Sequence, residues 1–481
     1  MNYTLLPFRY HALENKIFLT NEVGEYIFLD KSTFDDLRTG NLSKDSKVFM
    51  DLKSQHFLTD TEVDPVIDLL AVKYRTKKSF LENFTSLHMV VPTLRCNSDC
   101  IYCQVSSKDN KVSSYDMDVN TAKNVVETIF KTPSKYIKIE FQGGEPLLNF
   151  DIVTFIIEYS NKLNSIFKKS LEFVICTNLT LVNSNMLNYL KKKNVYISTS
   201  LDGSKSLHNK NRILRNKNGS YDSFYEKLLL AKNVLGSNSI SALMTTTKDS
   251  LAQPETIVNE YIRLGFSSIF VRMLNPFGLA KINKNELSYS VQEFFEFYKE
   301  ILSYIIEINI KGKYFVEEYA CLLLRRILTP FSTGFVDLQS PPGTGICGAI
   351  YNYNGNVFPS DEARMLSEMG NNRFLMGNVN KSSYEEIFYN KSFINLIKNA
   401  SLETTPLCSY CAYQVYCGSD PIRNYSEQGD ITGYKLNNVT CIKNRLILQY
   451  LIDLIEEKND KFTNVFWSWI TKRNCNKMVS N

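Results

Sequence analysis

Three cysteines stand close together near residue 100, in the run Cys96-Asn-Ser-Asp-Cys100-Ile-Tyr-Cys103. Thiolates at this spacing in one loop can wrap one face of a 4Fe–4S cluster. Three ligands leave one of the four irons without a protein side chain, and a molecule with an amine and a carboxylate can chelate that open iron. The alternatives for the triplet are a zinc site or buried thiols without a ligand.

Four further cysteines form a second group, Cys408, Cys411, Cys417 and Cys441. Four thiolates can ligate a second 4Fe–4S cluster completely, and a zinc knuckle is the alternative because zinc also accepts four thiolates. The chain has 11 cysteines in all. In a reducing cytoplasm they are expected to be metal ligands or buried thiols rather than disulfides.

Polar residues and glycines follow several runs that are predicted to be strands. Glu145 comes after Gly143 and Gly144, and its carboxylate can accept hydrogen bonds from an ammonium group while glycines let the backbone approach a ligand. The alternative is a plain turn that starts a helix at Pro146. Cys176, inside an apolar strand and without ligand spacing, is expected to be a core residue.

Further polar groups follow the third to sixth strands: Asn178, then Ser200 and Asp202, then Arg212, and finally Arg272. Hydroxyl and carboxylate groups suit ribose hydroxyls, and Arg212 can pair with a carboxylate. The alternatives are a turn at Asp202 and a surface ion pair for Arg212, and Arg272 either reaches the cofactor or is solvated.

The elements that must position these groups alternate between strands and helices from about residue 86. The predicted strands are 87–94, 136–142, 171–177, 195–201, 239–246 and 267–274. Amphipathic helices follow them, for example 119–131, 151–167, 220–235 and 251–264. Such βα units indicate a parallel sheet, either an open barrel of six strands or a doubly wound sheet. Because the polar groups follow strands, they are expected to converge at the carboxyl ends of the strands.

The rest of the chain is divided by composition. Residues 1–60 predict a small α+β domain, followed by a charged linker over 61–85. The barrel is assigned to residues 86–310 and a connector to 311–340. Residues 341–458, rich in Gly, Pro, Asn and Cys, predict a domain held by ligands, and 459–481 form a tail.

Charge and hydropathy exclude two classes of partner. The net charge of +5 comes from 55 basic and 50 acidic residues that are mixed along the chain, which does not favour a nucleic-acid surface. No apolar run is long enough to span a bilayer. The first residues lack the features of a signal peptide, so we expect no membrane association and a cytoplasmic location.

The triplet of cysteines is the motif of the radical S-adenosylmethionine (SAM) superfamily, which residues 86–280 resemble. The resemblance implies a partial (β/α)6 TIM-like barrel, a 4Fe–4S cluster and SAM as cofactors. It implies that Gly-Gly-Glu-Pro holds the methionine amine. The SAM-binding residues that it implies are Tyr102, Gln142, Gly143, Gly144, Glu145, Asn178, Ser200, Asp202 and Arg212.

The C-terminal region resembles the SPASM domain, an extension that usually carries two auxiliary clusters. Here Ser360 stands where a ligand cysteine is usual, and only Cys347 remains nearby. We therefore predict one auxiliary 4Fe–4S cluster, on the second cysteine group, and about eight irons per chain rather than about twelve. Asp361 occupies the place of the substrate base of sulfatase-maturating relatives, and a surface acid is the alternative.

Longer stretches, such as Leu19–Tyr26 and Ala71–Phe80, resemble the His-Xaa-Ser system radical SAM maturases over roughly residues 5–445. This implies a ribosomally made precursor peptide, partner proteins of the same system and an external electron donor. Reductive SAM cleavage would be followed by hydrogen abstraction and then by cross-linking or oxidation, with epimerisation as the second possibility. Residues 1–60 resemble winged-helix modules that bind leader peptides, or else extend the barrel. The alternative functions are a catalytically silent iron–sulfur scaffold and a zinc-based binding protein.

Overall fold

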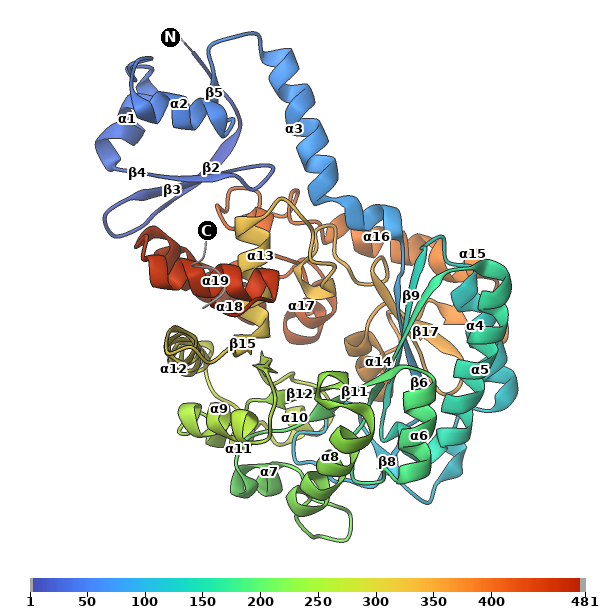
Figure 1. Cartoon of the computed structure of the whole chain (residues 1–481). Coiled ribbons are helices and arrows are strands. Elements are labelled where there is room, and N and C mark those ends of the chain that lie inside the picture. The colour runs from blue at the N-terminus through green and yellow to red at the C-terminus, as the bar shows by residue number, and fades with distance from the viewer. Residues whose placement is uncertain (1–2, 476–481) are drawn as a thin grey trace. The chain divides into compact units, whose positions relative to one another are not determined.

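The computed structural model describes residues 3–475, and Figure 1 shows the whole chain. The chain divides into two compact units. The first unit comprises residues 3–82, Ala320–Gly343 and Ile397–Ile470, and the second comprises Asn83–Tyr319, Thr344–Leu396 and residues 471–475. None of the helices in this described part has the length and apolar character needed to cross a bilayer.

A sheet of nine strands organises the second unit, in the order β14-β12-β11-β10-β9-β6-β16-β17-β18. Its six parallel barrel strands are β6 (Leu87–Thr93), β9 (Tyr136–Gly143), β10 (Ser170–Cys176), β11 (Val195–Ser200), β12 (Ile240–Thr245) and β14 (Val271–Arg272). Each strand pairs with the next along the chain, so the crossovers all run in one direction. This order belongs to the open barrel and excludes the doubly wound sheet, whose strand order reverses. The predicted α/β fold with a partial (β/α)6 barrel is thereby confirmed.

Three short strands extend this sheet beyond its first barrel strand. β16 (Gly348–Tyr351) pairs in parallel with β6, and β17 (Asn356–Phe358) and β18 (Gly377–Asn378) add in antiparallel fashion. The turn between β16 and β17 uses Gly355, whose φ of 84° is favourable for glycine. Part of the region after residue 341 thus continues the barrel sheet.

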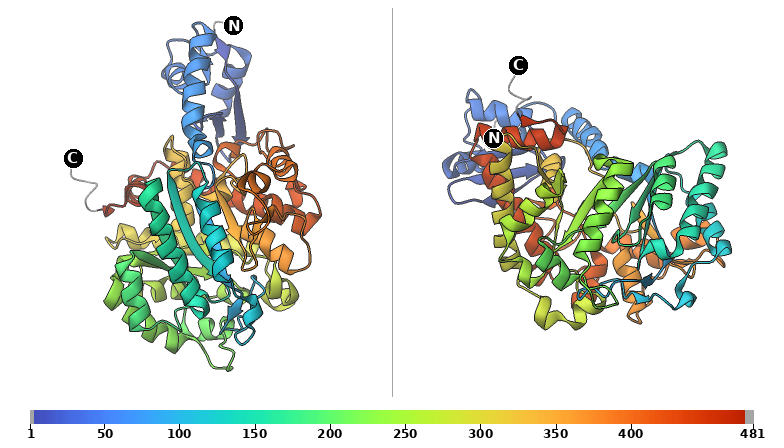
Figure 2. Two further views of the ribbon diagram at one scale, coloured as in Figure 1. Left: turned by 90° about the vertical axis from the view of Figure 1, so that its right-hand side faces the viewer. Right: turned by 60° about the horizontal axis from the view of Figure 1, so that its bottom comes forward.

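The main helices of the second unit cover the outer face of the sheet, as Figures 1 and 2 show. They are α4 (Val119–Phe130), α5 (Phe150–Phe167), α6 (Ser184–Lys192), α8 (Tyr221–Leu235), α9 (Pro254–Arg263) and α12 (Val291–Ile310). Asp118 caps α4 by accepting a hydrogen bond from the backbone N–H of Thr121. The buried face of α4 carries Val125, Val126 and Ile129.

Shorter elements complete the second unit. They are β7 (Arg95–Cys96), β8 (Lys108–Asp109), α7 (Lys205–Asn211), β13 (Ser268–Ile269), α10 (Gly278–Ile282), α11 (Lys284–Leu287), β15 (Val316–Glu317), α14 (Asp361–Glu368) and α15 (Tyr384–Phe388). α13 (Glu318–Leu328) and α16 (Lys391–Asn399) cross the boundaries between the two units.

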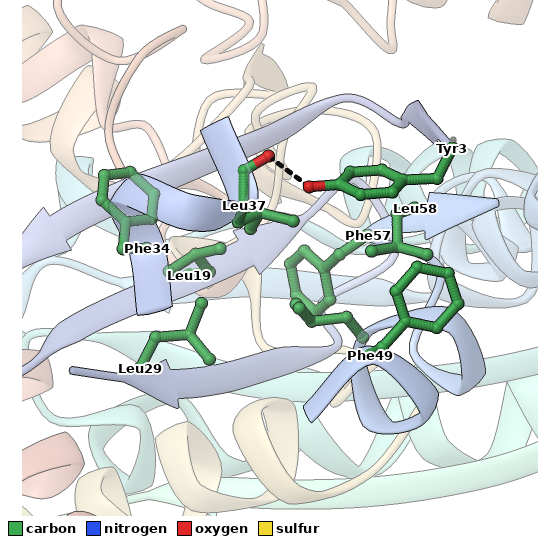
Figure 3. Close-up of a cluster of buried hydrophobic side chains, with 9 residues drawn as sticks. Tyr3, Leu19, Leu29, Phe34, Leu37, Phe49, Phe57 and Leu58 are labelled. Atoms are coloured by element: carbon green, nitrogen blue, oxygen red, sulfur yellow. Dashed lines mark hydrogen bonds between the residues drawn. The ribbon is translucent and has the colours of Figure 1, made fainter. Parts of the chain in front are cut away.

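The first unit begins with a small antiparallel sheet of β2 (Phe8–Ala12), β3 (Ile17–Asn21) and β4 (Tyr26–Leu29). α1 (Lys31–Thr39) has Asp30 as its N-cap and ends at Gly40. α2 (Lys47–Ser54) and the strand pair of β1 (Thr4–Leu5) with β5 (Leu58–Thr59) complete the module. Its core contains Tyr3, Leu19, Leu29, Phe34, Leu37, Phe49, Leu52, Phe57 and Leu58 (Figure 3).

The predicted linker over residues 61–85 contains a helix, α3 (Val63–Lys77). The later part of the first unit is helical as well, with α17 (Pro421–Gln428), α18 (Val439–Glu456) and α19 (Asp460–Thr471). Within this unit the small sheet contacts the cysteine-bearing segment, because Thr20 donates a hydrogen bond to the Ala412 carbonyl at 2.7 Å. The Phe18 and Tyr413 rings stack with their centroids 5.9 Å apart.

Candidate active site

A cavity of about 260 Å³ opens at the carboxyl ends of the barrel strands. Cys96, Cys100 and Cys103 all line it. Most of the predicted SAM-binding residues line it as well, namely Tyr102, Gln142, Gly143, Gly144, Glu145, Asn178, Ser200 and Arg212. The cysteines and the predicted SAM-binding residues therefore meet here although they are up to 116 positions apart in the sequence (Cys96 to Arg212), as their placement after successive strands predicted.

The first cysteine loop is fixed by its own backbone. The Cys103 N–H donates to the Cys100 carbonyl at 3.0 Å, and the Ser98 N–H donates to Cys96 Sγ at 3.4 Å. Burial raises the pKa of Cys100 to about 12, and burial together with the neighbouring Cys100 raises the pKa of Cys96. Thiols that are buried together in this way need a metal to displace their protons, and this donor set fits a 4Fe–4S cluster.

The two glycines after β9 allow two backbones to touch. A Cβ on Gly144 would lie 2.1 Å from the Arg95 carbonyl oxygen, and one on Gly143 would lie 2.5 Å from that of Thr93. Gly143 also has a φ of 121°. The Glu145 N–H donates to the Arg95 carbonyl at 2.7 Å. The glycines thus let the Glu145 segment pack directly against the backbone at the start of the cysteine loop. The sequence alone predicted only that glycines allow the backbone to approach a ligand.

Glu145 is buried and held by three donors. Its carboxylate accepts hydrogen bonds from Thr177 Oγ1 at 2.7 Å, from the Asn178 N–H at 2.9 Å and from the Leu147 N–H at 3.1 Å. Burial outweighs these bonds and raises the pKa of Glu145 to about 7. A cationic ammonium group at this carboxylate would stabilise its charged form.

Asp202 lies next to the cavity rather than in its lining. Its fully buried carboxylate accepts hydrogen bonds from Tyr102 Oη at 2.6 Å and from Arg212 Nε at 3.2 Å. The Arg212 guanidinium also lies over the Tyr102 ring, 5.2 Å from its centroid. Arg212 is therefore part of a buried ion pair and not a surface one. The carboxylate of Asp202 thus positions two cavity residues, Tyr102 and Arg212. The sequence, which suggested only a turn or a ribose contact for Asp202, did not indicate this role.

Residues 90–261 match the family model described as the radical SAM superfamily. The chain carries a radical SAM domain. The matched residues include all three cysteines of the first group, Glu145 and Arg212. The predictions of a radical SAM enzyme, and of SAM and a 4Fe–4S cluster as its cofactors, are thereby confirmed at the level of the superfamily.

Two relatives show how far the similarity extends. An uncharacterised protein of Methanocaldococcus jannaschii is 35% identical over 193 residues, which are 39% of this chain and 63% of that protein. The chain thus matches less than two thirds of the length of that relative. The cysteine-type anaerobic sulfatase-maturating enzyme of Clostridium novyi is 23% identical over 352 residues, or 70% of this chain and 88% of that protein.

Solved structures share the fold beyond the radical SAM domain. The match to the structure of native anSMEcpe with bound AdoMet spans 78% of this chain and 100% of the anSMEcpe chain, with a TM-score of 0.65 and 18% sequence identity. The structure of SuiB from Streptococcus suis, bound to its precursor peptide SuiA, covers 91% of this chain and 99% of its own, with a TM-score of 0.53 and 14% identity. The fold likeness therefore reaches past the barrel into the remaining residues.

Asp361 also lines the cavity of the radical SAM domain. It is the first residue of α14 and accepts a hydrogen bond from Arg364 Nε at 2.9 Å. The preceding Ser360 caps the helix by accepting from the Ala363 N–H at 3.3 Å. The serine in the position expected for a ligand cysteine thus has a structural task of its own.

The second cysteine group lies in the first unit, and its four thiols come together. The Cys411 N–H donates to the Cys408 carbonyl at 3.1 Å, and Cys441 is in the first turn of α18, where Asn438 accepts from its N–H. Burial and then the charges of the other three cysteines raise the pKa of Cys408 to about 12. Asn444 Nδ2 also donates to Cys417 Sγ at 3.5 Å. Cys347 lies in the second unit instead, apart from this group in the chain division.

Among residues 3–475, no three His, Cys, Asp or Glu side chains surround a point where a single metal ion would fit. The chemistry of the donor sets, three and four thiols, fits 4Fe–4S clusters with and without an open iron.

The expectation that Cys176 is a core residue does not hold. Its thiol lines the cavity, together with Glu140 of the neighbouring strand β9. The signal for this was present in strand 136–142, where Lys138, Glu140 and Gln142 alternate with apolar residues. Such alternation indicates a polar inner face of the barrel, onto which a residue of the next strand can also project. The sequence placed Arg272 either at the cofactor or in solvent, and in the structure it lines the cavity.

Proposed function

We propose that the protein is a radical SAM maturase that modifies a ribosomally synthesised peptide of the His-Xaa-Ser repeat type. The observation that carries the proposal is the meeting, in one cavity, of three cysteines and the buried carboxylate of Glu145. Three thiols can hold a 4Fe–4S cluster with one open iron, and Glu145 can receive the ammonium group of SAM. When bound, the two cofactors supply a 5′-deoxyadenosyl radical that removes a hydrogen atom from the substrate.

The remaining cavity residues bind and orient SAM and the peptide substrate. Tyr102, held by Asp202, and the cation of Arg212 define one wall, while Asn178 and Ser200 offer polar groups for the ribose. Asp361 serves as the base that takes a proton when the substrate radical is oxidised. Arg364, which is fully buried, fixes the orientation of that carboxylate. The second cysteine group holds one auxiliary cluster that accepts the electron.

A peptide substrate is supported by what the relatives act on. SuiB was solved with a precursor peptide and anSMEcpe with the Cp18Cys peptide. TigE of Paramaledivibacter caminithermalis, 28% identical over 140 residues, is a radical SAM cyclopropyl synthase. We propose a cross-link or an oxidation as the product.

The first unit offers a place for the leader of such a peptide. Among the described strands β4 pairs only with β3, so one of its edges is open for an added strand. α3 exposes Ile67, Leu69 and Val72, with 43%, 47% and 55% of their surfaces accessible. Lys73 of α3 pairs with Glu25, which precedes β4, so the helix and the open edge border the same cavity. We propose that an extended leader pairs with β4 along this cavity and continues onto the exposed apolar side chains of α3.

The decisive experiment is anaerobic reconstitution, followed by incubation with SAM, a reductant and a His-Xaa-Ser peptide. We expect about eight irons per chain, release of 5′-deoxyadenosine and a peptide that is two hydrogens lighter. The triple variant Cys96→Ala/Cys100→Ala/Cys103→Ala is the control and should release none. A brown protein that forms no 5′-deoxyadenosine would support the alternative of a silent scaffold, and zinc without sulfide would exclude both.

The leader site has its own test, by fluorescence anisotropy with a labelled precursor peptide. Val72→Asp places a charge on the exposed apolar face of α3 and should weaken binding at least about tenfold, a change of about 1.4 kcal/mol. Ile166→Asp is the matched control, since Ile166 is 74% exposed on α5. Equal affinities of the two variants would count against the site.

A further inference from the structure

Cys176 and Glu140 form a pair on the inner face of the barrel, and neither cofactor accounts for it. Cys176 ends β10 and Glu140 lies on β9, and both line the cavity that also holds the first cysteine group. Cys176 Sγ donates a hydrogen bond to Glu140 Oε1 at 3.3 Å, and Gln142 Nε2 donates to the same oxygen at 2.6 Å. The S–H group is thus held inside the reaction chamber.

We propose that Cys176 is a catalytic residue that donates a hydrogen atom to a carbon radical of the bound peptide. The inference rests on the proposed function, because that function supplies the radical. An S–H bond is weak enough to give its hydrogen to a carbon radical, whereas the O–H bond of a serine is not. Burial, and then the neighbouring charge of Glu140, raise the pKa of Cys176 well above its ordinary value, which keeps the hydrogen on the sulfur.

The peptide C–H bond breaks when its hydrogen passes to the 5′-deoxyadenosyl radical, and a carbon radical remains. The S–H bond of Cys176 then breaks, a new C–H bond forms on the peptide, and a sulfur radical is left on Cys176. A one-electron donor of the class that also reduces the cluster converts this radical to a thiolate, and a proton from water restores the thiol.

The product of this route has the mass of the substrate, with retained or inverted configuration at the attacked carbon. This route returns a hydrogen atom to a peptide radical that has been neither coupled nor oxidised. Glu140 is a positioning residue here, because its carboxylate accepts the hydrogen bond of the S–H group. Cys347 offers a contrast in the same unit, since it is only 6% exposed and does not line the cavity.

Solvent deuterium makes the transfer visible, because a thiol exchanges its hydrogen with D2O and a peptide C–H bond does not. The reconstituted full-length protein is incubated in D2O with SAM, dithionite and a His-Xaa-Ser peptide, and the peptide is analysed by mass spectrometry. We expect peptide that has gained one deuterium on carbon. Cys176→Ser keeps a hydrogen bond to Glu140 but should lower the deuterium gained per 5′-deoxyadenosine formed at least about tenfold.

Glu140→Gln should lower the same ratio, and Cys321→Ser, a cysteine outside the cavity lining, should leave it unchanged. Wild-type protein that forms 5′-deoxyadenosine but adds no deuterium would overturn this inference and leave the proposed function standing. An equal ratio in Cys176→Ser would also overturn it. Absence of 5′-deoxyadenosine would instead refute the proposed function, and this inference with it.

A second readout is independent of turnover. Iodoacetamide is applied to the reconstituted protein and the modified cysteines are mapped by peptide mass. Because the raised pKa of Cys176 leaves little thiolate, we expect slow modification of Cys176 that becomes faster as the pH rises. When SAM and the peptide are both bound, modification at the same pH should be at least about tenfold slower. If the peptide slows the modification of Cys176 no more than SAM alone does, the substrate does not face this thiol.

Discussion

Arg212→Met provides a sharp test of the buried polar network beside the cavity. Methionine keeps much of the length of the side chain and removes the charge that faces Asp202, whose carboxylate is fully buried. The two groups are 3.2 Å apart, at which distance their attraction is about 5 kcal/mol for an effective dielectric constant of about 20. Removing one partner of a buried pair typically costs about 3–5 kcal/mol, because the other charge stays buried without compensation.

That loss converts to a large change in melting temperature. At about 2 °C for each kcal/mol in a large domain, we expect a decrease of about 6–10 °C. The assay is a thermal melt of the metal-free protein under reducing conditions, so that neither SAM nor the cluster contributes. Lys205→Met is the matched control, since Lys205 pairs with Asp222 at 2.7 Å but both side chains are exposed, at 58% and 75%. Its cost should stay below about 1 kcal/mol.

The double variant Asp202→Asn/Arg212→Met completes the argument. If the cost of Arg212→Met comes from the unpaired carboxylate, the double variant should lose clearly less than the sum of the two single variants. A decrease for Arg212→Met that matches the Lys205→Met control would contradict a costly unpaired carboxylate at Asp202, as would strict additivity of the two single variants. In that case the hydrogen bonds from Tyr102, Asn211 and the Thr245 N–H would suffice to hold Asp202.

Three further predictions address the carboxylate, the glycines and the auxiliary cysteines. The pKa of Glu145 is raised by burial to about 7 from 4.5, so the folded protein keeps a proton that the unfolded chain loses, and stability should fall as the pH rises between these values. Glu145→Gln should remove that fall, worth at most about 3 kcal/mol, and urea midpoints at pH 5 and pH 7.5 that change in parallel for both proteins would contradict this. Gly144→Ala places a Cβ 2.1 Å from the Arg95 carbonyl and should weaken SAM binding, measured by equilibrium dialysis, at least about tenfold. Gly236→Ala, with no atom within 4 Å of the new Cβ, is its control, and equal SAM affinities would argue against the close approach. Cys441→Ala should lower the iron content by about four atoms per chain while 5′-deoxyadenosine still forms, and an unchanged iron content would remove Cys441 from the ligand set.

The local features of the barrel could be predicted from the sequence. Strands β9, β10 and β11 were expected within a residue or two of their observed bounds, because each is a short apolar or alternating run between turn signals. The cap of α4 by Asp118 is equally local, because an aspartate directly before an amphipathic run is a common N-cap. The cysteine ligands were also accessible, since their spacing within one loop is a property of a few consecutive residues.

Other features depend on residues that are far apart in the chain. The hydrogen bond between Tyr102 and Asp202 joins residues 100 positions apart, and that between Cys176 and Glu140 joins residues 36 positions apart. The extension of the barrel sheet by β16 pairs Gly348 with Leu87. No periodicity within one segment encodes such partners, because they follow from the register of neighbouring strands.

The amino-acid sequence alone therefore settled the types of donor groups and the end of the barrel at which they stand, since spacing and strand order are local and follow from backbone geometry. The tertiary structure decided which of these groups face the cavity. Asp202 lies outside the cavity lining and holds Tyr102 by a hydrogen bond, whereas the thiol of Cys176 lines the cavity. The physical reason is that burial and hydrogen bonding between strands, rather than residue type, determine whether a polar side chain meets a substrate or supports another side chain.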